Sequence, residues 1–188
     1  MSKSFLLIAA LFLEGAFGHP PKCFFGLNPG YTCDTASPSV RFRFDPQMNQ
    51  CHSFIFKGCG GNKNNYETPG DCGLNCDVDL RSYVQCPLGF PPVFDSRGNS
   101  QCSLEGSETG EGCESEDAIC TNFNNIALCC NRTVLTGFQD DNSATCPSGK
   151  QRWQIDGTTV LAKSCDDVTC PEGYSCNVGN FFSYCCEN

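Results

Sequence analysis

The sequence has few of the residues that a nucleic-acid or metal site needs. Only 12 of its 188 residues are lysine or arginine, against 21 acids, and the formal net charge is −9. A chain of this charge repels phosphate backbones and anionic membrane surfaces. No Cys-x-x-Cys pair occurs, although zinc sites commonly use that spacing, and there are only two histidines. We therefore expect no metal, no cofactor, and neither nucleic acid nor membrane as a partner.

Long apolar runs are also missing, with one exception near the start. Phe5–Leu13 is apolar, follows Lys3, and is too short to cross a bilayer. Ala16 and Gly18 are the small residues that a signal peptidase prefers three and one positions before its cleavage point. This predicts a secretory signal peptide over residues 1–18 and a secreted, extracellular mature chain.

Catalytic patterns are missing too. Neither His19 nor His52 belongs to a recognisable nucleophile pattern. Cysteine thiols are expected to be paired in an oxidising compartment, which removes them as nucleophiles. We therefore predict that the protein is not an enzyme.

Cysteine is what the sequence has in excess. It has 18 cysteines, 19 glycines and 11 prolines, while charged residues make up only 18% of the chain. This composition is typical of small modules that bury little apolar surface and are stabilised by disulfides. The fold class predicted from it is small and disulfide-rich.

Cysteine spacing and charge both divide the chain at the same place. The N-terminal block, Cys23–Cys76, has six cysteines and equal numbers of acids and bases, four of each. From Asp77 onward there are 16 acids and 6 bases, a net charge of −10. Residues 77–85 have no cysteine and are predicted to be a linker.

The remaining twelve cysteines form two copies of one pattern. The first repeat spans 86–130 and the second spans 146–186, and each begins with Cys-Pro-x-Gly and ends with adjacent cysteines. The gap before the final pair is eight residues in both copies. Six cysteines allow about 15 pairings, and the sequence does not choose among them. Because bonds between adjacent cysteines are strained, each member of the final pair is expected to bond elsewhere.

The N-terminal block has a readable order of elements. Ser39–Phe44 and His52–Lys57 alternate polar and apolar residues, as half-buried strands do. The turn-forming residues Asp45–Asn49 lie between them, which predicts a β-hairpin. Thr68 followed by Pro69 is a typical helix start, so a short helix is predicted at the end of the block.

These elements and the cysteine spacing resemble a known family. The gaps after the third cysteine are seven, twelve and three residues, and the run Gly58-Cys59-Gly60-Gly61-Asn62-x-Asn64-Asn65-Tyr66 follows the same pattern. Cys23–Cys76 resembles a Kunitz (bovine pancreatic trypsin inhibitor-like) domain, an α+β fold with a β-hairpin and a short C-terminal helix. The resemblance implies the bridges Cys23–Cys76, Cys33–Cys59 and Cys51–Cys72. The two repeats resemble the lustrin-type cysteine-rich repeats of nematode secreted proteins.

The Kunitz resemblance implies a function. Kunitz inhibitors insert a preorganised loop into the cleft of a serine protease, and the residue after the second cysteine fills the specificity pocket. Carried over to this chain, the loop and its support are Thr32, Cys33, Asp34, Thr35 and Ala36, with Gly58, Cys59 and Gly60 across the bridge.

The loop departs from the family in two ways. Asp34 stands where inhibitors of trypsin-like enzymes have lysine or arginine, and it would meet like charge at the base of a trypsin-like pocket. The gap between Cys33 and Cys51 is 17 residues, two more than the family usually has. Thr35 or Ala36 could instead fill an elastase-like pocket. Arg41 lies in the strand register and is the weakest candidate for the pocket.

The sequence is compatible with two functions. The first is a Kunitz-type serine protease inhibitor of atypical specificity, with a serine protease as partner. The alternative is a non-inhibitory extracellular matrix or cuticle-associated structural protein, which would use the Kunitz fold as a scaffold and matrix components as partners. The acidic, repeat-built tail favours the alternative.

The tail has three further features that bear on function or packing. Asn131 is the asparagine of the only N-glycosylation sequon. Glu105–Asp117 has six acids and no base, but its glycines and ligand spacing favour a solvated loop over a calcium site. The aromatic residues Trp153, Phe181, Phe182 and Tyr184 are expected to form a small core.

Overall fold

The computed structural model describes residues 20–76, 85–123 and 125–188. The predicted signal peptide over 1–18 lies outside these ranges, as does the predicted linker except for Gln85. No helix among the residues described is long and apolar enough to cross a membrane.

The N-terminal block contains four strands and two short helices. Their bounds are η1 Pro21–Phe24, β1 Tyr31–Thr32, β2 Ser39–Asp45, β3 Gln50–Phe56, β4 Gly58–Cys59 and α1 Pro69–Cys76. The long hairpin β2–β3 pairs from Ser39 with Phe56 to Asp45 with Gln50, close to the predicted limits. Helix α1 begins where expected, because Thr68 Oγ1 accepts a hydrogen bond from the Asp71 N–H at 3.0 Å.

Three disulfides hold this block together. They join Cys23 to Cys76, Cys33 to Cys59 and Cys51 to Cys72, the three pairs that the family resemblance implies. Cys23, Cys72 and Cys76 are fully buried. Two of the bridges therefore attach α1 to the N-terminus and to the hairpin, inside the core.

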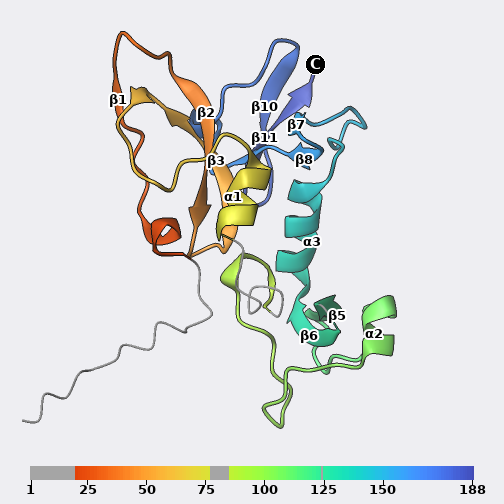
Figure 1. Cartoon of the computed structure of the whole chain (residues 1–188). Helices are drawn as coiled ribbons and strands as arrows, with labels where there is room; N and C mark the ends of the chain where they lie inside the picture. Colours follow the sequence, from red (N-terminus) through yellow and green to blue (C-terminus); the bar gives the residue numbers. More distant parts are fainter. Residues whose placement is uncertain (1–19, 77–84, 124) are drawn as a thin grey trace, which may run out of the picture.

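The tail is built around two further hairpins. Its elements are η3 Pro87–Gly89, α2 Leu104–Thr109, β5 Ala118–Phe123, β6 Ile126–Asn131, α3 Arg132–Asn142, β7 Gln154–Ile155, β8 Thr158–Thr159, β9 Leu161–Ala162, η4 Cys165–Asp167, β10 Tyr174–Val178 and β11 Ser183–Glu187. Hairpin β5–β6 belongs to the first repeat and β10–β11 to the second. In Figure 1, β10 and β11 lie beside the N-terminal block, and α3 leads away from them to β5 and β6.

The two repeats have the same disulfide order. In each, the first cysteine bonds the sixth, the second bonds the fourth, and the third bonds the fifth. The pairs are Cys86–Cys130, Cys102–Cys120 and Cys113–Cys129, then Cys146–Cys186, Cys165–Cys176 and Cys170–Cys185. The members of each adjacent pair bond elsewhere. The lustrin-type assignment of these repeats stays a prediction.

One five-stranded sheet joins the N-terminal block to the second repeat. Its strand order is β10-β11-β9-β3-β2, and the junction is a parallel pairing of Ser53 with Ala162. The core is continuous across the junction, since Phe42 and Phe44 of the hairpin belong to the same buried cluster as Val160 and Ala162. The burial of this apolar surface stabilises the two parts jointly.

A group of buried charges lies at the same junction. Lys163 Nζ is 2.5 Å from Asp45 Oδ2, and Arg43 and His52 approach the same oxygen at 3.5 and 3.4 Å. Burial alone would raise the pKa of Asp45, but Lys163, the Gln47 N–H and Arg43 outweigh it and lower the value to about 2. Burial lowers the pKa of His52. Asp45 is therefore ionised at neutral pH, whereas the His52 imidazole is neutral.

The prediction of a solvated loop over 105–117 is wrong for the residues up to Thr109, which belong to helix α2. Ser103 Oγ accepts the Gly106 N–H at 2.9 Å, and Gly110 ends α2 in the left-handed region with φ 76°. These capping residues stabilise one and a half turns of helix despite the acidic composition. The predicted aromatic core forms in part: Phe182 and Tyr184 are buried in one cluster with Phe181 packed against it, whereas Trp153 packs against a separate cluster that contains Cys185.

Candidate functional site

The predicted loop is held at its base by two short strands. Strand β1 pairs with β4 through Tyr31 with Cys59 and Thr32 with Gly58. The Cys33–Cys59 disulfide, with 6.0 Å between Cα atoms, closes the loop just beyond this pairing. The predicted residues Thr32, Cys33, Gly58 and Cys59 are therefore brought together.

Beyond the disulfide the chain turns sharply. Cys33 and Ala36 form an antiparallel bridge, so that Asp34 and Thr35 occupy the tip of a turn. Residues 34–38 are all exposed. Thr35 Oγ1 folds back toward the bridge and lies 3.4 and 3.5 Å from the Sγ atoms of Cys33 and Cys59. Asp34 is left as the most accessible charge of the loop, and it makes no ion pair within the ranges that the structure describes.

Two glycines make the close packing of the loop possible. A Cβ atom at Gly58 would lie 2.5 Å from the carbonyl oxygen of Ala36, and at Gly60 it would lie 2.7 Å from the Tyr31 ring. Both residues also have positive φ, 112° and 72°, which other residues rarely adopt. A side chain at Gly58 would displace the loop at Ala36, and one at Gly60 would displace the Tyr31 ring.

Asn64 connects the N-terminal segment around η1 to the hairpin β2–β3. The sequence did not reveal this role. Its Nδ2 donates to the carbonyl oxygens of Cys23, Phe25 and Phe44 at 3.1, 3.0 and 2.9 Å. Its Oδ1 accepts the Phe44 N–H at 2.8 Å. Asn64 is 3% exposed, so these bonds satisfy an amide that would otherwise be buried at a cost.

The other candidates lie away from the loop. Arg41 NH1 forms an ion pair with Glu67 at 2.8 Å, on the hairpin. Asn131 Oδ1 caps α3 by accepting the Val134 N–H at 3.0 Å, which leaves the nitrogen that would carry a glycan without a hydrogen bond in the described residues. Glycosylation there stays a prediction.

Three cysteines lie close enough together to suggest a metal site, but all three are in disulfides. The sulfur atoms of Cys102, Cys113 and Cys129 lie within 4.8 Å of one another. Each is already bonded to another cysteine sulfur. A disulfide sulfur is not a thiolate and does not serve as a metal ligand in this way.

The N-terminal block, which contains the loop, matches a known protein family. Residues 22–77 match the Kunitz/Bovine pancreatic trypsin inhibitor domain family. The major allergen Ani s 1 of Anisakis simplex is 31% identical over 175 residues, which cover 88% of this chain and 87% of that protein. A BPTI/Kunitz inhibitor domain-containing protein of Caenorhabditis elegans is 23% identical over 169 residues, covering 88% of this chain and 89% of that protein.

A third relative matches a shorter part of the chain. The Kunitz-type serine protease inhibitor Vur-KIn of Vipera renardi is 40% identical over 58 residues, which cover 31% of this chain and 83% of that protein. The Anisakis and Caenorhabditis relatives, by contrast, align with most of the chain and so with much of its cysteine-rich tail.

Proposed function

The chain belongs to the Kunitz/bovine pancreatic trypsin inhibitor domain family, and from that premise we propose that it is a secreted serine protease inhibitor with a specificity other than that of trypsin inhibitors. Kunitz-type serine protease inhibitors are among its relatives, and the family is not enzymatic. Its nine disulfides fit an extracellular protein.

The exposed loop carries this proposal. Residues 34–38 are free of contacts that would bury them, while the pairing β1–β4 and the Cys33–Cys59 bridge restrain both ends. A restrained loop loses little conformational entropy when it binds, and this is how standard-size interfaces reach high affinity.

Asp34 gives the reason for the atypical specificity. In a trypsin-like pocket its carboxylate would face another carboxylate and lose its water, without a cation to pair with. A pocket lined by basic or small polar groups would accept Asp34 or Thr35 without that penalty. The target is therefore a protease of acidic or small-residue specificity.

Two observations favour the alternative function, a structural extracellular protein. The bridge between Cys33 and Ala36 makes a turn at the place where an inhibitor presents an extended, substrate-like segment. The N-terminal block also shares a sheet and a core with the second repeat, as a scaffold element would. This alternative predicts that no serine protease is inhibited.

The experiment compares three forms of the full chain against trypsin, chymotrypsin, elastase and an acid-specific serine protease. They are the natural sequence, Asp34→Lys, and Asp34→Lys with two of residues 35–38 deleted. The natural protein is expected to inhibit trypsin poorly, and the combined variant to bind it at least about a hundredfold more tightly, mainly through slower dissociation. Glu108→Lys, an exposed charge change on α2, controls for net charge.

The outcomes separate the two functions. Inhibition of an elastase-like or acid-specific enzyme by the natural sequence supports the proposal. Strong trypsin inhibition by the natural sequence would show that Asp34 does not fill the pocket. Failure of every form against every enzyme, with disulfides intact, would make the structural alternative the better reading.

A further inference from the structure

Several positions of the two repeats correspond through equivalent hydrogen bonds. In the first repeat the Val93 N–H donates to the Cys129 carbonyl oxygen at 2.7 Å. In the second repeat the Trp153 N–H donates to the Cys185 carbonyl oxygen at 2.9 Å. Since Cys129 and Cys185 are each the fifth cysteine of their repeat, Val93 and Trp153 occupy the same place.

A second pair of residues corresponds in the hairpins. Cys120 pairs with Cys129 in β5–β6, and Cys176 pairs with Cys185 in β10–β11. Ala118 and Tyr174 both stand two residues before the fourth cysteine of their repeat, at the first position of the hairpin. The first repeat therefore has a valine and an alanine where the second has a tryptophan and a tyrosine.

In the second repeat these aromatic residues fill space. Trp153 and Tyr174 are partly buried, and both pack with Cys170 against the cluster that contains Cys185. The third-to-fifth cysteine bridge, Cys170–Cys185, belongs to the same packed cluster. Aromatic side chains bury large areas, so this packing contributes much of the repeat's apolar core.

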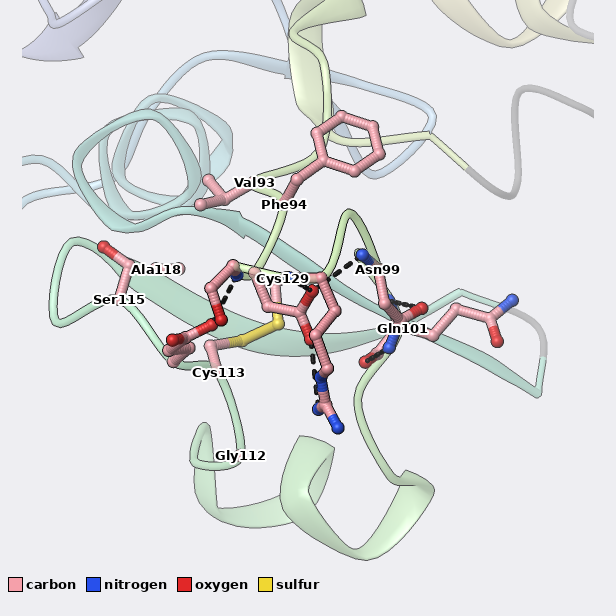
Figure 2. A pocket seen from close by; sticks show the side chains of 13 residues that line it. Val93, Phe94, Asn99, Gln101, Gly112, Cys113, Ser115, Ala118 and Cys129 are labelled. Atoms are coloured by element: carbon pink, nitrogen blue, oxygen red, sulfur yellow. Dashed lines mark hydrogen bonds and ion pairs between the residues drawn. A yellow bond between two sulfur atoms is a disulfide. The ribbon is translucent and has the colours of Figure 1, made fainter.

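In the first repeat no side chain of the described residues fills the corresponding space. A cavity of about 480 Å³ lies there, lined by Val93, Ala118 and the Cys113–Cys129 bridge. Figure 2 shows these residues around the hollow, with Phe94 beside it. Phe94 is 60% exposed and is thus available at the rim. The size is within the range of protein cavities that take a ligand group, about 300–1,000 Å³.

The rim of this hollow is acidic. Asp95 and Glu114 line it together with one cation, Arg97. The Asn99 N–H, at 2.7 Å from Asp95 Oδ1, is the main reason why the pKa of Asp95 is lowered. Glu114 Oε2 accepts the Ser96 N–H at 2.6 Å. Asp95 is already paired with the Arg97 guanidinium at 3.2 Å, whereas Glu114 makes no ion pair among the described residues. Glu114 is therefore the carboxylate that favours a guest with a positive charge.

One edge of the hollow could also pair with a further strand. In the second repeat, β9 pairs with β11 on one side and with β3 on the other. Its counterpart in the first repeat, 100–102, bonds to β6 through Gln101 with Leu128, and within the residues that the structure describes no strand lies on its other side. Gln101 lines the hollow. A polypeptide segment could therefore lie along this edge with a side chain in the hollow.

We propose that the hollow of Val93, Asp95, Glu114, Ala118 and the Cys113–Cys129 bridge is a docking site for an aromatic side chain, flanked by a basic residue, on an extended segment of a partner polypeptide. The guest supplies what the first repeat lacks and the second repeat contains. The site is separate from the loop at Asp34 and does not depend on protease inhibition.

The test uses the full chain, labelled with ¹⁵N, and a peptide copied from the second repeat. Acetyl-Gln-Arg-Trp-Gln-amide, the sequence of residues 151–154, is titrated while the backbone amide signals are followed. Saturable shifts are expected at Val93, Ala118 and Cys113. Two control peptides, with alanine in place of tryptophan or glutamate in place of arginine, are expected to bind at least about tenfold and several-fold more weakly, respectively.

Two variants assign the binding to the hollow. Ala118→Tyr places the counterpart's side chain there and is expected to weaken peptide binding about tenfold or more. Glu114→Gln is expected to weaken it several-fold and to reduce its salt dependence, whereas Glu116→Gln, a nearby exposed acid, leaves it unchanged. If Ala118→Tyr does not fold with native disulfides, Val93→Trp fills the same space and replaces it. Absence of saturable shifts at these residues, or shifts that persist in the filled variant, would overturn the proposal.

Discussion

At the scale of single residues, three aspartates show how surroundings decide what a carboxylate does. Asp34 is exposed and unpaired in the loop, so its charge is available to a partner. Asp45 is 4% exposed and is held ionised by Lys163 and Arg43. Asp141 is 1% exposed and binds three backbone N–H groups. The two buried carboxylates serve stability, and the exposed one has the recognition role that we propose for the loop.

His52 makes stability depend on pH. Its ring is 3% exposed, and burial, with Arg43 and Lys163 nearby, holds its pKa below the ordinary value of 6.5. The unfolded chain therefore binds the proton more readily, and stability is full above pH 6.5 and falls as the pH drops from there through the folded-state pKa. Asp45 adds a second loss as the pH falls from 3.8 to about 2.

We therefore expect the thermal midpoint to decline between pH 6.5 and 5 in the natural protein. The slope from His52 is at most about 1.4 kcal/mol per pH unit, the value for one proton. His52→Gln, which cannot take up a proton, should flatten this region and leave the loss below pH 4 unchanged. Calorimetry of both proteins from pH 3 to pH 8 is the measurement, and an unchanged slope between pH 6.5 and 5 in the variant would contradict this role for His52.

At the scale of elements, Asp141 attaches the end of α3 to the turn between β10 and β11. Its carboxylate accepts the N–H groups of Asn180, Phe181 and Phe182 at 2.8, 2.6 and 2.9 Å. A Cβ atom at Gly179 would lie 2.2 Å from Asp141 Oδ1, so the turn needs glycine there. The Asp141 side chain thus fixes the helix relative to the hairpin, and Asn180 Nδ2 adds a bond to the Gly137 carbonyl oxygen at 3.4 Å.

Asp141→Ala removes the acceptor of all three N–H groups, of which that of Phe182 is buried and those of Asn180 and Phe181 are partly buried. A buried unsatisfied group costs about 1–3 kcal/mol and a partly buried one less, so we expect a loss of about 2–3 kcal/mol in the free energy of unfolding. Asp140→Asn, an exposed neighbour on the same helix, should have almost no effect. Denaturant unfolding with the disulfides intact measures both variants. Similar small losses in the two would mean that the turn is held by other contacts.

The local elements were predictable and their assembly was not. Hairpin β2–β3 follows from the alternation of Val40, Phe42 and Phe44 with polar residues, which depends only on neighbours in sequence. Strand β9 has two residues, too few for any periodicity, and it joins Ala162 to Ser53 across more than a hundred positions. The hollow beside Val93 likewise depends on a contact distant in sequence, the hydrogen bond from Val93 to Cys129. The turn at Asp34 comes from the local bridge between Cys33 and Ala36. Cysteine spacing located the loop but did not give its conformation.

At the scale of the whole molecule, the cysteine spacing and the disulfides divide the chain at residue 77. The packing of the core does not follow this division. All nine bridges lie within the N-terminal block or within a single repeat. The sheet and the core nevertheless cross from the block to the second repeat through β3 and β9. The first repeat, at the far end of α3, has no comparable share in that sheet (Figure 1).

This arrangement predicts that a change in the second repeat alters the N-terminal block. Lys163→Glu places a second carboxylate against buried Asp45 and removes the cation at 2.5 Å. Because the Lys163 side chain is 43% exposed, water screens part of the effect, and we expect roughly tenfold faster amide exchange over β3, equal to about 1.4 kcal/mol. Lys150→Glu makes the same charge change at an exposed position of the same repeat and should leave β3 unaffected. Hydrogen exchange of both variants is measured by mass spectrometry. Equal protection of residues 50–56 in the two proteins would mean that the N-terminal block is stable without its junction to the second repeat.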